Sequence, residues 1–387
     1  GNINRKFMSD LRLDSTIRFS NLDKLRAFAA ISVVVYHVIE HTSWSSFPVT
    51  GLNLWWRTGW LGVDLFFVIS GFVIYFSAFS LEKSYGAAWK SVYASHRFFR
   101  IAPLYFFTCI IFVFLIQPQI LFTPVSNIFF QFISHLLFFH NFFPSTQGAI
   151  NGVNWSIGVE MQFYLFILIF WNWIKRASPL KILLVFSAIA CIWKIAAFYI
   201  LHSAGAHKLW FATAQLSGSL DVFGFGIAAC KWVLANGNRN DWVSLGIKAL
   251  AAISAGFIMI KLLWMTPNYW GSVYYVGFFR ILTGLSAAAL IVFLIALPNT
   301  ALGWFSGIID YLGKISYGIY LWHLPIILSL KNLNINAGMV FLVATLACTL
   351  ILASITYHLI EKNWIQHGKS DQACSKIGAI LKSIRLN

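Results

Sequence analysis

The amino-acid sequence predicts an all-α integral membrane protein with about ten transmembrane helices and both termini in the cytoplasm. Of its 387 residues, 59% are hydrophobic and 10% are charged, whereas charged residues make up about a quarter of an ordinary soluble domain. A soluble fold of this length has too little interior to bury so much apolar surface. The number of long apolar stretches and the alternating charge of the loops between them lead to the same conclusion.

Ten stretches are long and apolar enough to be membrane spans, since a helix that crosses the hydrocarbon needs about 20 mostly apolar residues. A further apolar stretch, residues 126–143, contains His135 and His140 and is followed by Pro144. We expect it to form a re-entrant or interfacial helix rather than a span. The ten predicted spans, with soft boundaries, are residues 22–41, 60–80, 101–117, 158–174, 181–201, 209–234, 242–263, 273–297, 312–330 and 336–361.

The basic residues alternate from loop to loop. The chain carries 28 Lys and Arg against 12 Asp and Glu, and the basic residues cluster at both ends and in every second loop. The loop at 117–157, on the opposite side, has no charged residue. Because cytoplasmic loops retain Lys and Arg, this pattern places both termini in the cytoplasm with an even number of spans between them. It also accounts for the net charge of +16 without nucleic acid as a partner, which such a charge would suggest for a soluble protein.

One membrane domain is expected over residues 1–365, followed by a basic cytoplasmic tail at 366–387. The spaced apolar residues of the tail fit either a helix lying on the inner membrane surface or a disordered segment. None of the five cysteines has metal-like spacing, so the sequence predicts neither a zinc site nor a disulfide framework. We therefore expect no bound metal.

The first predicted span carries the most informative polar residues. Arg26 and His37 are eleven residues apart, and a helix returns to within about 20° of the same direction over that interval. Asp23, one turn before Arg26, shares this face. Charged groups within a span are costly and mark functional sites by default, so His37 is a candidate catalytic residue. A packed core histidine is the alternative.

Two carboxylates are predicted to lie at the depth of His37, in the outer half of the membrane. Asp64 lies near the outer end of the second span and Glu160 near the outer end of the fourth. A histidine beside a carboxylate is a suitable general base for a hydroxyl, because the carboxylate fixes the tautomer and stabilises the imidazolium. The sequence does not distinguish which carboxylate supports His37, and either could instead be an interfacial residue.

Two arginines precede the third predicted span on the cytoplasmic side. Arg97 and Arg100 are three residues apart, so they lie on one helical face, and guanidinium groups suit phosphate. Taken alone, this pair is explained by the positive-inside rule. Together with Arg26, which is expected at the same level, it forms a candidate site for a phosphate-bearing donor.

Six segments, in order along nearly the whole chain, resemble the membrane acyltransferase 3 family, whose members O-acylate bacterial surface glycans. Each segment alone is a weak signal, whereas six in order are specific. The segments are residues 22–27 extending to 36–37, 62–72, 97–105, 154–160 with 163–164, 312–323 and 357–361.

The resemblance implies an enzyme of about ten helices that uses cytoplasmic acyl-CoA, with acetyl-CoA as the favoured donor. It implies that His37 is the catalytic group, in the pattern of an arginine and a histidine separated by ten residues. Where the family often has two adjacent acids, this chain has Glu160 followed by Met161, which leaves one acid there. The expected catalytic residues are His37, Glu160 and Asp64; the expected donor-binding residues are Arg26, Arg97 and Arg100; and the expected supporting residues are Asp23, Trp155, Ser156 and Tyr164.

The expected acceptor is an O-antigen, an exopolysaccharide or a similar glycan, and the expected location is the bacterial inner membrane. The hydrolase-like extracytoplasmic domain that some family members carry is missing from this sequence, so we expect a separate partner chain to supply it if one is needed. Direct transfer and transfer through an acyl-enzyme both remain open, as do the acceptor hydroxyl, the acyl length and the oligomeric state. The alternative function is a secondary transporter or flippase for a lipid-linked or glycan substrate, because a histidine and acids within the membrane also suit proton coupling.

Overall fold

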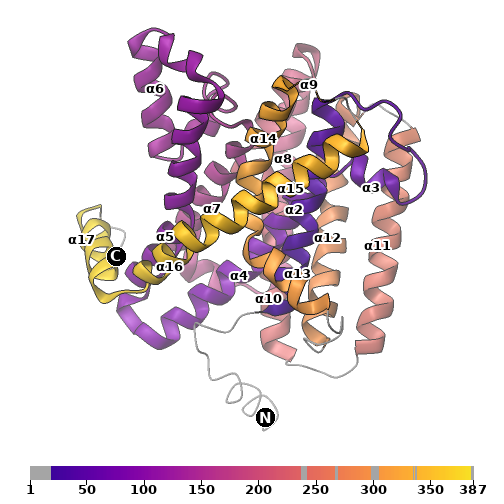
Figure 1. Ribbon diagram of the computed structural model, residues 1–387. Coiled ribbons are helices and arrows are strands. Elements are labelled where there is room, and N and C mark those ends of the chain that lie inside the picture. Colours follow the sequence, from indigo (N-terminus) through magenta and orange to yellow (C-terminus); the bar gives the residue numbers. More distant parts are fainter. Residues whose placement is uncertain are drawn as a thin grey trace. The chain divides into compact units, whose positions relative to one another are not determined.

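The computed structural model describes residues 19–236, 242–265, 269–297, 305–333, 335 and 338–384. Helices account for most of these residues, and no β-strand occurs among them (Figure 1). The expectation of an all-α protein is therefore confirmed for this part of the chain.

Several helices have the length and the apolar composition to cross a membrane, so the chain is a multi-pass membrane protein. Helix α2, Ser20–His41, has 22 residues, but its charged residues make it too polar to qualify by composition alone. The predicted total of about ten spans and the side of the termini stay predictions. Among the described residues, six stretches qualify: Leu61–Ile116, Gly152–Arg176, Pro179–Ala204, Leu216–Asn236, Val273–Ala296 and Met339–Gly368.

The chain folds into two compact units, which are described separately. The first unit comprises the described parts of Gly1–Ala29, Leu61–Trp89 and Ile169–Gly313, and the second those of Ala30–Trp60, Lys90–Leu168 and Lys314–Asn387. The first unit contains α4 (Leu61–Tyr85), α8 (Pro179–Leu201), α9 (Ala206–Thr213), α10 (Leu216–Asn236), α11 (Trp242–Met265), α12 (Val273–Ala296) and most of α13 (Phe305–Lys314). The second contains most of α2, α3 (Asn53–Arg57), most of α5 (Trp89–Ile111), α6 (Val125–Leu136), most of α7 (Trp155–Arg176), α14 (Ser316–Asn332), α15 (Met339–Thr356), α16 (Lys362–Gly368) and α17 (Asp371–Ser383).

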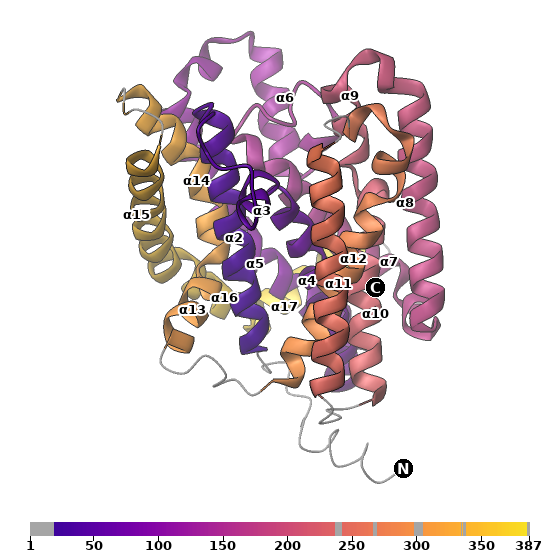
Figure 2. The same cartoon turned by 90° about the vertical axis from the view of Figure 1, so that its right-hand side faces the viewer.

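In the first unit, α10 packs against α4, α8 and α12. Helix α12 also packs against α11, and Figure 2 shows these two side by side. Two glycines let α4 and α10 approach closely: a Cβ on Gly71 would collide with the carbonyl of Phe223, and a Cβ on Gly226 would collide with the carbonyl of Val68. Small residues at such crossings are typical of membrane helices, which associate through close packing rather than through the hydrophobic effect.

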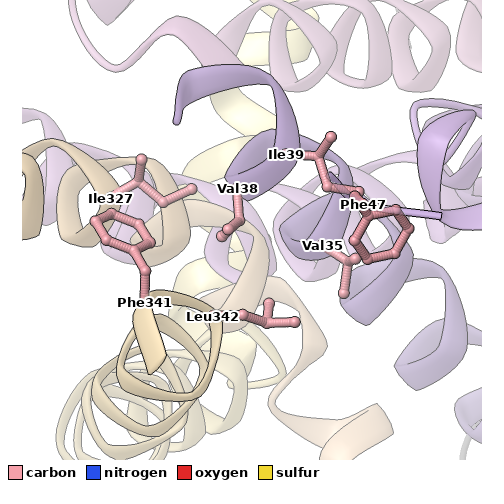
Figure 3. Packing of buried hydrophobic residues seen from close by; sticks show 7 residues of the cluster. All are labelled: Val35, Val38, Ile39, Phe47, Ile327, Phe341 and Leu342. Atoms are coloured by element: carbon pink, nitrogen blue, oxygen red, sulfur yellow. The ribbon is translucent and has the colours of Figure 1, made fainter. Parts of the chain in front are cut away.

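In the second unit, a buried apolar cluster fixes the later part of α2 against α14 and α15 (Figure 3). Phe47, from the loop that follows α2, packs at one side of this cluster. These contacts determine how α2 is rotated about its axis, and therefore where its polar residues point. The cluster consists of Val35, Val38, Ile39, Phe47, Ile327, Phe341 and Leu342.

Helix α5 differs from the span predicted at 101–117, because it begins at Trp89. It then continues as a π-helical turn, Phe112–Ile116. Arginine is a good helix former, so Arg97 and Arg100 end the apolar stretch without ending the helix. Both arginines therefore lie on a regular helix rather than in a loop.

Other boundaries also differ from the prediction. The stretch at 209–234 forms two helices, α9 and α10, and the stretch at 312–330 is interrupted at Ile315, between α13 and α14. The stretch at 336–361 starts at positions outside the described residues; its described part is α15 followed by a π-helical turn, Tyr357–Glu361.

The stretch at 126–143 does not form a span, as expected from its sequence. Helix α6 has 12 residues, far fewer than the roughly 20 that a crossing needs. Val125, Phe129 and Leu136 on α6 are exposed, which fits an interfacial position. The tail predicted to be either an amphipathic helix or disordered forms α17 at Asp371–Ser383, whereas 385–387 lie outside the described residues, as do 1–18.

Candidate active site

His37 of α2 lies against a second histidine, His323 of α14. Its Nδ1 is 2.9 Å from Nε2 of His323, and the two rings meet edge to edge, with centroids 5.0 Å apart and an angle of 22° between their planes. His323 is completely buried and His37 is half-buried. The apolar cluster of Figure 3 joins the same two helices, so it holds the two imidazoles at hydrogen-bonding distance.

The hydrogen bond between the two rings allows two arrangements, because each neutral imidazole carries one N–H. In the first, His37 donates from Nδ1 to Nε2 of His323, and Nε2 of His37 keeps its lone pair. In the second, His323 donates from Nε2 to His37, and Nε2 of His37 carries the hydrogen. Nδ1 of His323 is buried and has no hydrogen-bond partner among the described residues, so the contacts of the pair fit either arrangement.

The first of these arrangements makes Nε2 of His37 a candidate base. Within the described part of the chain, no hydrogen bond engages Nε2. The neighbouring rings on the same helix are those of Tyr36 and His41, with centroids 5.2 and 5.9 Å from His37. The partner of His37 in the structure is an imidazole; the supporting role expected of Asp64 or Glu160 stays a prediction.

Hydrogen bonds connect α14 to the start of α7 beside the histidine pair. The hydroxyl of Tyr320 is 2.7 Å from that of Ser156 and donates to the carbonyl of Val153 at 3.1 Å. The ring of Tyr320 lies 5.6 Å from that of His323. Ser156 and Trp155, both expected to support the site, stand in the first turn of α7, and Ser156 takes part in this network.

Glu160 lies one turn further along α7. It accepts a hydrogen bond of 2.6 Å from the hydroxyl of Tyr164, so the structure brings together these two residues that the sequence had selected. Electrostatic interactions also link Glu160 to Tyr93 and Tyr317. The acid is therefore part of a polar network among α5, α7 and α14.

The two arginines of α5 belong to the same network. The Arg97 guanidinium lies over the ring of Tyr93, 5.9 Å from its centroid, and it also acts electrostatically on Tyr164. Arg100 forms an ion pair of 3.7 Å with Glu361, whose side chain is 1% exposed compared with 29% for Arg100. We call Arg97, Arg100, Glu160 and Glu361, with Tyr93, Tyr164 and Tyr317, the arginine–glutamate cluster.

Arg26 and Asp23 form the pair that their spacing predicted. Nη1 of Arg26 donates to the carboxylate of Asp23 at 2.9 Å, and the side chains are 26% and 3% exposed. Both lie on the same helix as His37, eleven residues or more before it. The donor-binding role expected of Arg26 and the supporting role expected of Asp23 stay predictions.

Asp64 has a partner within the first unit. Arg280 of α12 donates to its carboxylate from Nε at 3.1 Å and from Nη2 at 2.5 Å, and both side chains are buried. A second buried ion pair of 2.5 Å joins Lys194 and Asp221 in the same unit. Asp64 is therefore the acceptor of a fork of charge-assisted hydrogen bonds, which is a stable structural arrangement.

The sequence did not predict the roles of two residues, His323 and Arg280. Both are ionisable residues within apolar stretches of the sequence. Such residues need partners, because an isolated charge or polar group in a membrane is costly. The identity of each partner was not visible, because both contacts join helices far apart in the chain. Among the described residues, no group of three His, Cys, Asp or Glu is arranged to hold a metal ion.

Comparison with known proteins places this arrangement in a family. Residues 19–358 match the model of the acyltransferase 3 family, described as an acyltransferase domain. The chain belongs to this family. The resemblance carried by the six segments is therefore confirmed over most of the chain.

Curated relatives in this family have been named as O-acetyltransferases. The chain is 29% identical to the peptidoglycan O-acetyltransferase OatA of Listeria monocytogenes over 374 residues, which cover 88% of this chain and 55% of that protein. It is 27% identical to the O-acetyltransferase OatA of Staphylococcus aureus over 375 residues, 88% of this chain and 56% of that one. The chain thus spans about half the length of these relatives. No solved structure matches the chain significantly.

Proposed function

We propose that this chain is an O-acyltransferase that moves an acyl group, with acetyl favoured, from cytoplasmic acyl-CoA to a hydroxyl of a cell-envelope glycan. The observation that carries the proposal is the histidine pair, in which Nδ1 of His37 lies 2.9 Å from Nε2 of His323. We take His37 to donate from Nδ1 in this contact, which leaves a lone pair on its Nε2. A base of this kind suits the removal of a proton from a hydroxyl. Membership of the acyltransferase 3 family supports the same class of reaction.

In the proposed reaction, Nε2 of His37 takes the proton of the glycan hydroxyl as its oxygen attacks the carbonyl carbon of the thioester. The carbon–sulfur bond then breaks, and the proton passes from the imidazolium to the leaving thiolate. The products are a glycan ester and the free thiol of CoA. A route through an acyl group held covalently on His37 gives the same products and is the alternative.

The donor phosphates are proposed to bind at Arg97 and Arg100, with Arg26 as a further contact. Guanidinium groups are suited to phosphate, and Arg100 is partly exposed while its ion pair with Glu361 is long at 3.7 Å. A phosphate group can displace the carboxylate of Glu361 from so long a contact. Glu160 is proposed to order this cluster through Tyr164, rather than to orient His37.

The acceptor and the topology are also proposals. The relative from Listeria monocytogenes is named a peptidoglycan O-acetyltransferase, which favours peptidoglycan as the acceptor, whereas the sequence alone suggested O-antigen or exopolysaccharide. The chain is proposed to cross the bacterial inner membrane about ten times, with both termini in the cytoplasm. Asp64 is proposed to be structural, because Arg280 already engages both of its oxygens. An extracytoplasmic partner chain would belong on the acceptor side.

The experiment that tests the function is release of CoA thiol from acetyl-CoA by the purified protein in detergent, with peptidoglycan fragments as acceptor. His37→Ala should lower the rate by on the order of 10²–10⁴-fold, the usual contribution of a general base. His207→Ala is the matched control, because His207 is exposed on α9, and it should leave the rate unchanged. Normal thiol release by His37→Ala would refute the assignment. Transport of a glycan without thiol release would favour the flippase.

A further inference from the structure

We propose that His323 is the positioning residue of the active site: it holds the imidazole of His37 in the tautomer and orientation that expose Nε2 as the base. This inference rests on the proposed function. It goes further by assigning the supporting role to a neutral histidine instead of to either of the acids considered from the sequence.

Geometry supports this role first. The two ring nitrogens are 2.9 Å apart, within the range of a good hydrogen bond. His323 is completely buried, and α2 and α14 are packed together by the apolar cluster of Figure 3, so the position of its Nε2 is fixed. Rotation of the His37 ring about its side-chain bonds would therefore break the hydrogen bond.

The proposed role requires one direction of this hydrogen bond. His37 donates from Nδ1, and Nε2 of His323 accepts through its lone pair. In this arrangement Nε2 of His37 keeps a lone pair that can take the proton of the substrate hydroxyl.

The same contact assists the proton transfer. When Nε2 of His37 takes a proton, the ring becomes positive, and its Nδ1–H still donates to the lone pair of His323. A hydrogen bond from a charged donor is roughly twice as strong as a neutral one, so the contact strengthens as the imidazolium forms. Because His323 is neutral in this arrangement, it stabilises the imidazolium without adding a second charged group, which would be costly to bury in a membrane protein.

The position of His323 is itself determined by α14. Tyr320, three residues earlier on the same face, is fixed by its contacts with Ser156 and the Val153 carbonyl. Asn151 donates to the carbonyl of Leu321 at 2.9 Å. These contacts fix α14 against the segment before α7, and they thereby fix the position of His323.

The test compares three substitutions of His323. In His323→Gln the amide oxygen can reach the position of Nε2 and accept the same hydrogen bond. In His323→Asn the side chain is one methylene shorter and cannot, and in His323→Leu there is no acceptor. We expect kcat for CoA release to fall on the order of 10²–10⁴-fold in the Asn and Leu variants, because the tautomer is no longer fixed. The KM for acetyl-CoA should stay within about twofold, and His323→Gln should recover at least about tenfold of the loss in kcat, since part of the orienting hydrogen bond returns.

Thermal unfolding of each variant in detergent checks the fold, and the Asn and Gln variants remain comparable if the Leu variant is unstable. Equal kcat in the Asn and Gln variants, or a loss confined to KM, would overturn the positioning role. A His37→Ala protein with full activity would instead refute the proposed function. Loss of activity in His37→Ala together with normal activity in His323→Asn would refute only the role of His323.

Discussion

Replacing Asp64 with alanine should destabilise the protein by about 3–5 kcal/mol, because a buried guanidinium would be left without a counter-charge. Arg280 is 8% exposed and donates to Asp64 at 3.1 and 2.5 Å. In the Asp64→Ala variant, its Nη1 would still donate hydrogen bonds to the carbonyl of Gly218 at 3.0 Å and to the hydroxyl of Ser219 at 3.2 Å. These neutral groups satisfy hydrogen bonds but do not neutralise the positive charge.

Removing both charges should restore most of this stability. In the double variant Asp64→Leu with Arg280→Met, two apolar side chains of suitable length replace the buried pair, and such exchanges are often neutral or stabilising. We expect the free energy of unfolding to return to within about 1 kcal/mol of the original protein. The single variant and the double variant thus separate the cost of an unpaired charge from the contribution of the pair.

The assay is thermal unfolding in detergent, followed for each variant together with CoA release from acetyl-CoA. The control is Lys175→Ala, which breaks an ion pair with Glu82 whose side chains are 37% and 26% exposed; such exposed pairs contribute about 0–1 kcal/mol. A double variant as unstable as the single one would refute the reasoning from burial. A stable double variant without activity would show that Asp64 has a chemical role after all.

Three further predictions concern packing, donor binding and pH. Gly226→Ala should lower the stability by about 1–3 kcal/mol, as overpacking does, because its Cβ would meet backbone atoms of α4; thermal unfolding measures this. Arg100→Ala should raise the KM for acetyl-CoA about tenfold, the effect of about 1.4 kcal/mol of lost binding, with kcat changed much less. Acidification should destabilise the protein, because burial lowers the pKa of His140 to about 4, and burial with the adjacent imidazole lowers that of His135 to about 3.

The sign of the pH effect follows from proton uptake. Unfolded imidazoles take up protons near pH 6.5, whereas in the folded protein these two do so only near pH 3 to 4, so the unfolded state binds more protons between these values. The contribution of these two histidines to stability is therefore complete above about pH 6.5 and falls by about 1.4 kcal/mol per pH unit for each of them below it. His135→Phe should make the loss of stability with falling pH smaller by about 1.4 kcal/mol per pH unit, and an unchanged slope would contradict the assignment.

The other two predictions have their own controls. Gly307→Ala adds a Cβ on α13 that meets nothing within 4 Å, so it should leave the unfolding temperature unchanged or raise it slightly. Equal destabilisation in Gly226→Ala and Gly307→Ala would show that close packing is not the cause. Arg176→Ala removes an arginine at the end of α7 that lies outside the arginine–glutamate cluster. An equal rise of KM in that variant would indicate a general loss of charge attraction instead of a binding site.

Hydropathy predicted the apolar helices well because a bilayer imposes one requirement along the whole length of a span. The span predicted at 22–41 and helix α2, Ser20–His41, agree within two residues. The prediction was wrong where a helix extends beyond its apolar stretch. Helix α5 already includes Arg97 and Arg100, because a charged residue does not end a helix. The helix break at Ile315, between α13 and α14, contains no proline, so nothing in the composition indicated it.

Residues on one helix could be related to one another from the sequence, but contacts between helices could not. Periodicity placed Asp23 beside Arg26, and the ion pair is present at 2.9 Å. The contact between His37 and His323 joins residues 286 positions apart, and periodicity reports only which face of a helix a residue occupies. The candidate base was therefore predictable from its own helix, whereas its partner was not.

The π-helical turn Tyr357–Glu361 shows how a single residue can set the register of a chain end. Along α15 the buried positions Thr349, Ala353 and Thr356 follow at intervals of four and three, but the next buried position is Glu361, five residues on. A π turn accommodates one additional residue in the helix. If the same residues were wound as a regular α-helix, Glu361 would be turned by about 100°, away from Arg100. The additional residue of the π turn therefore keeps the carboxylate on the buried face of the helix.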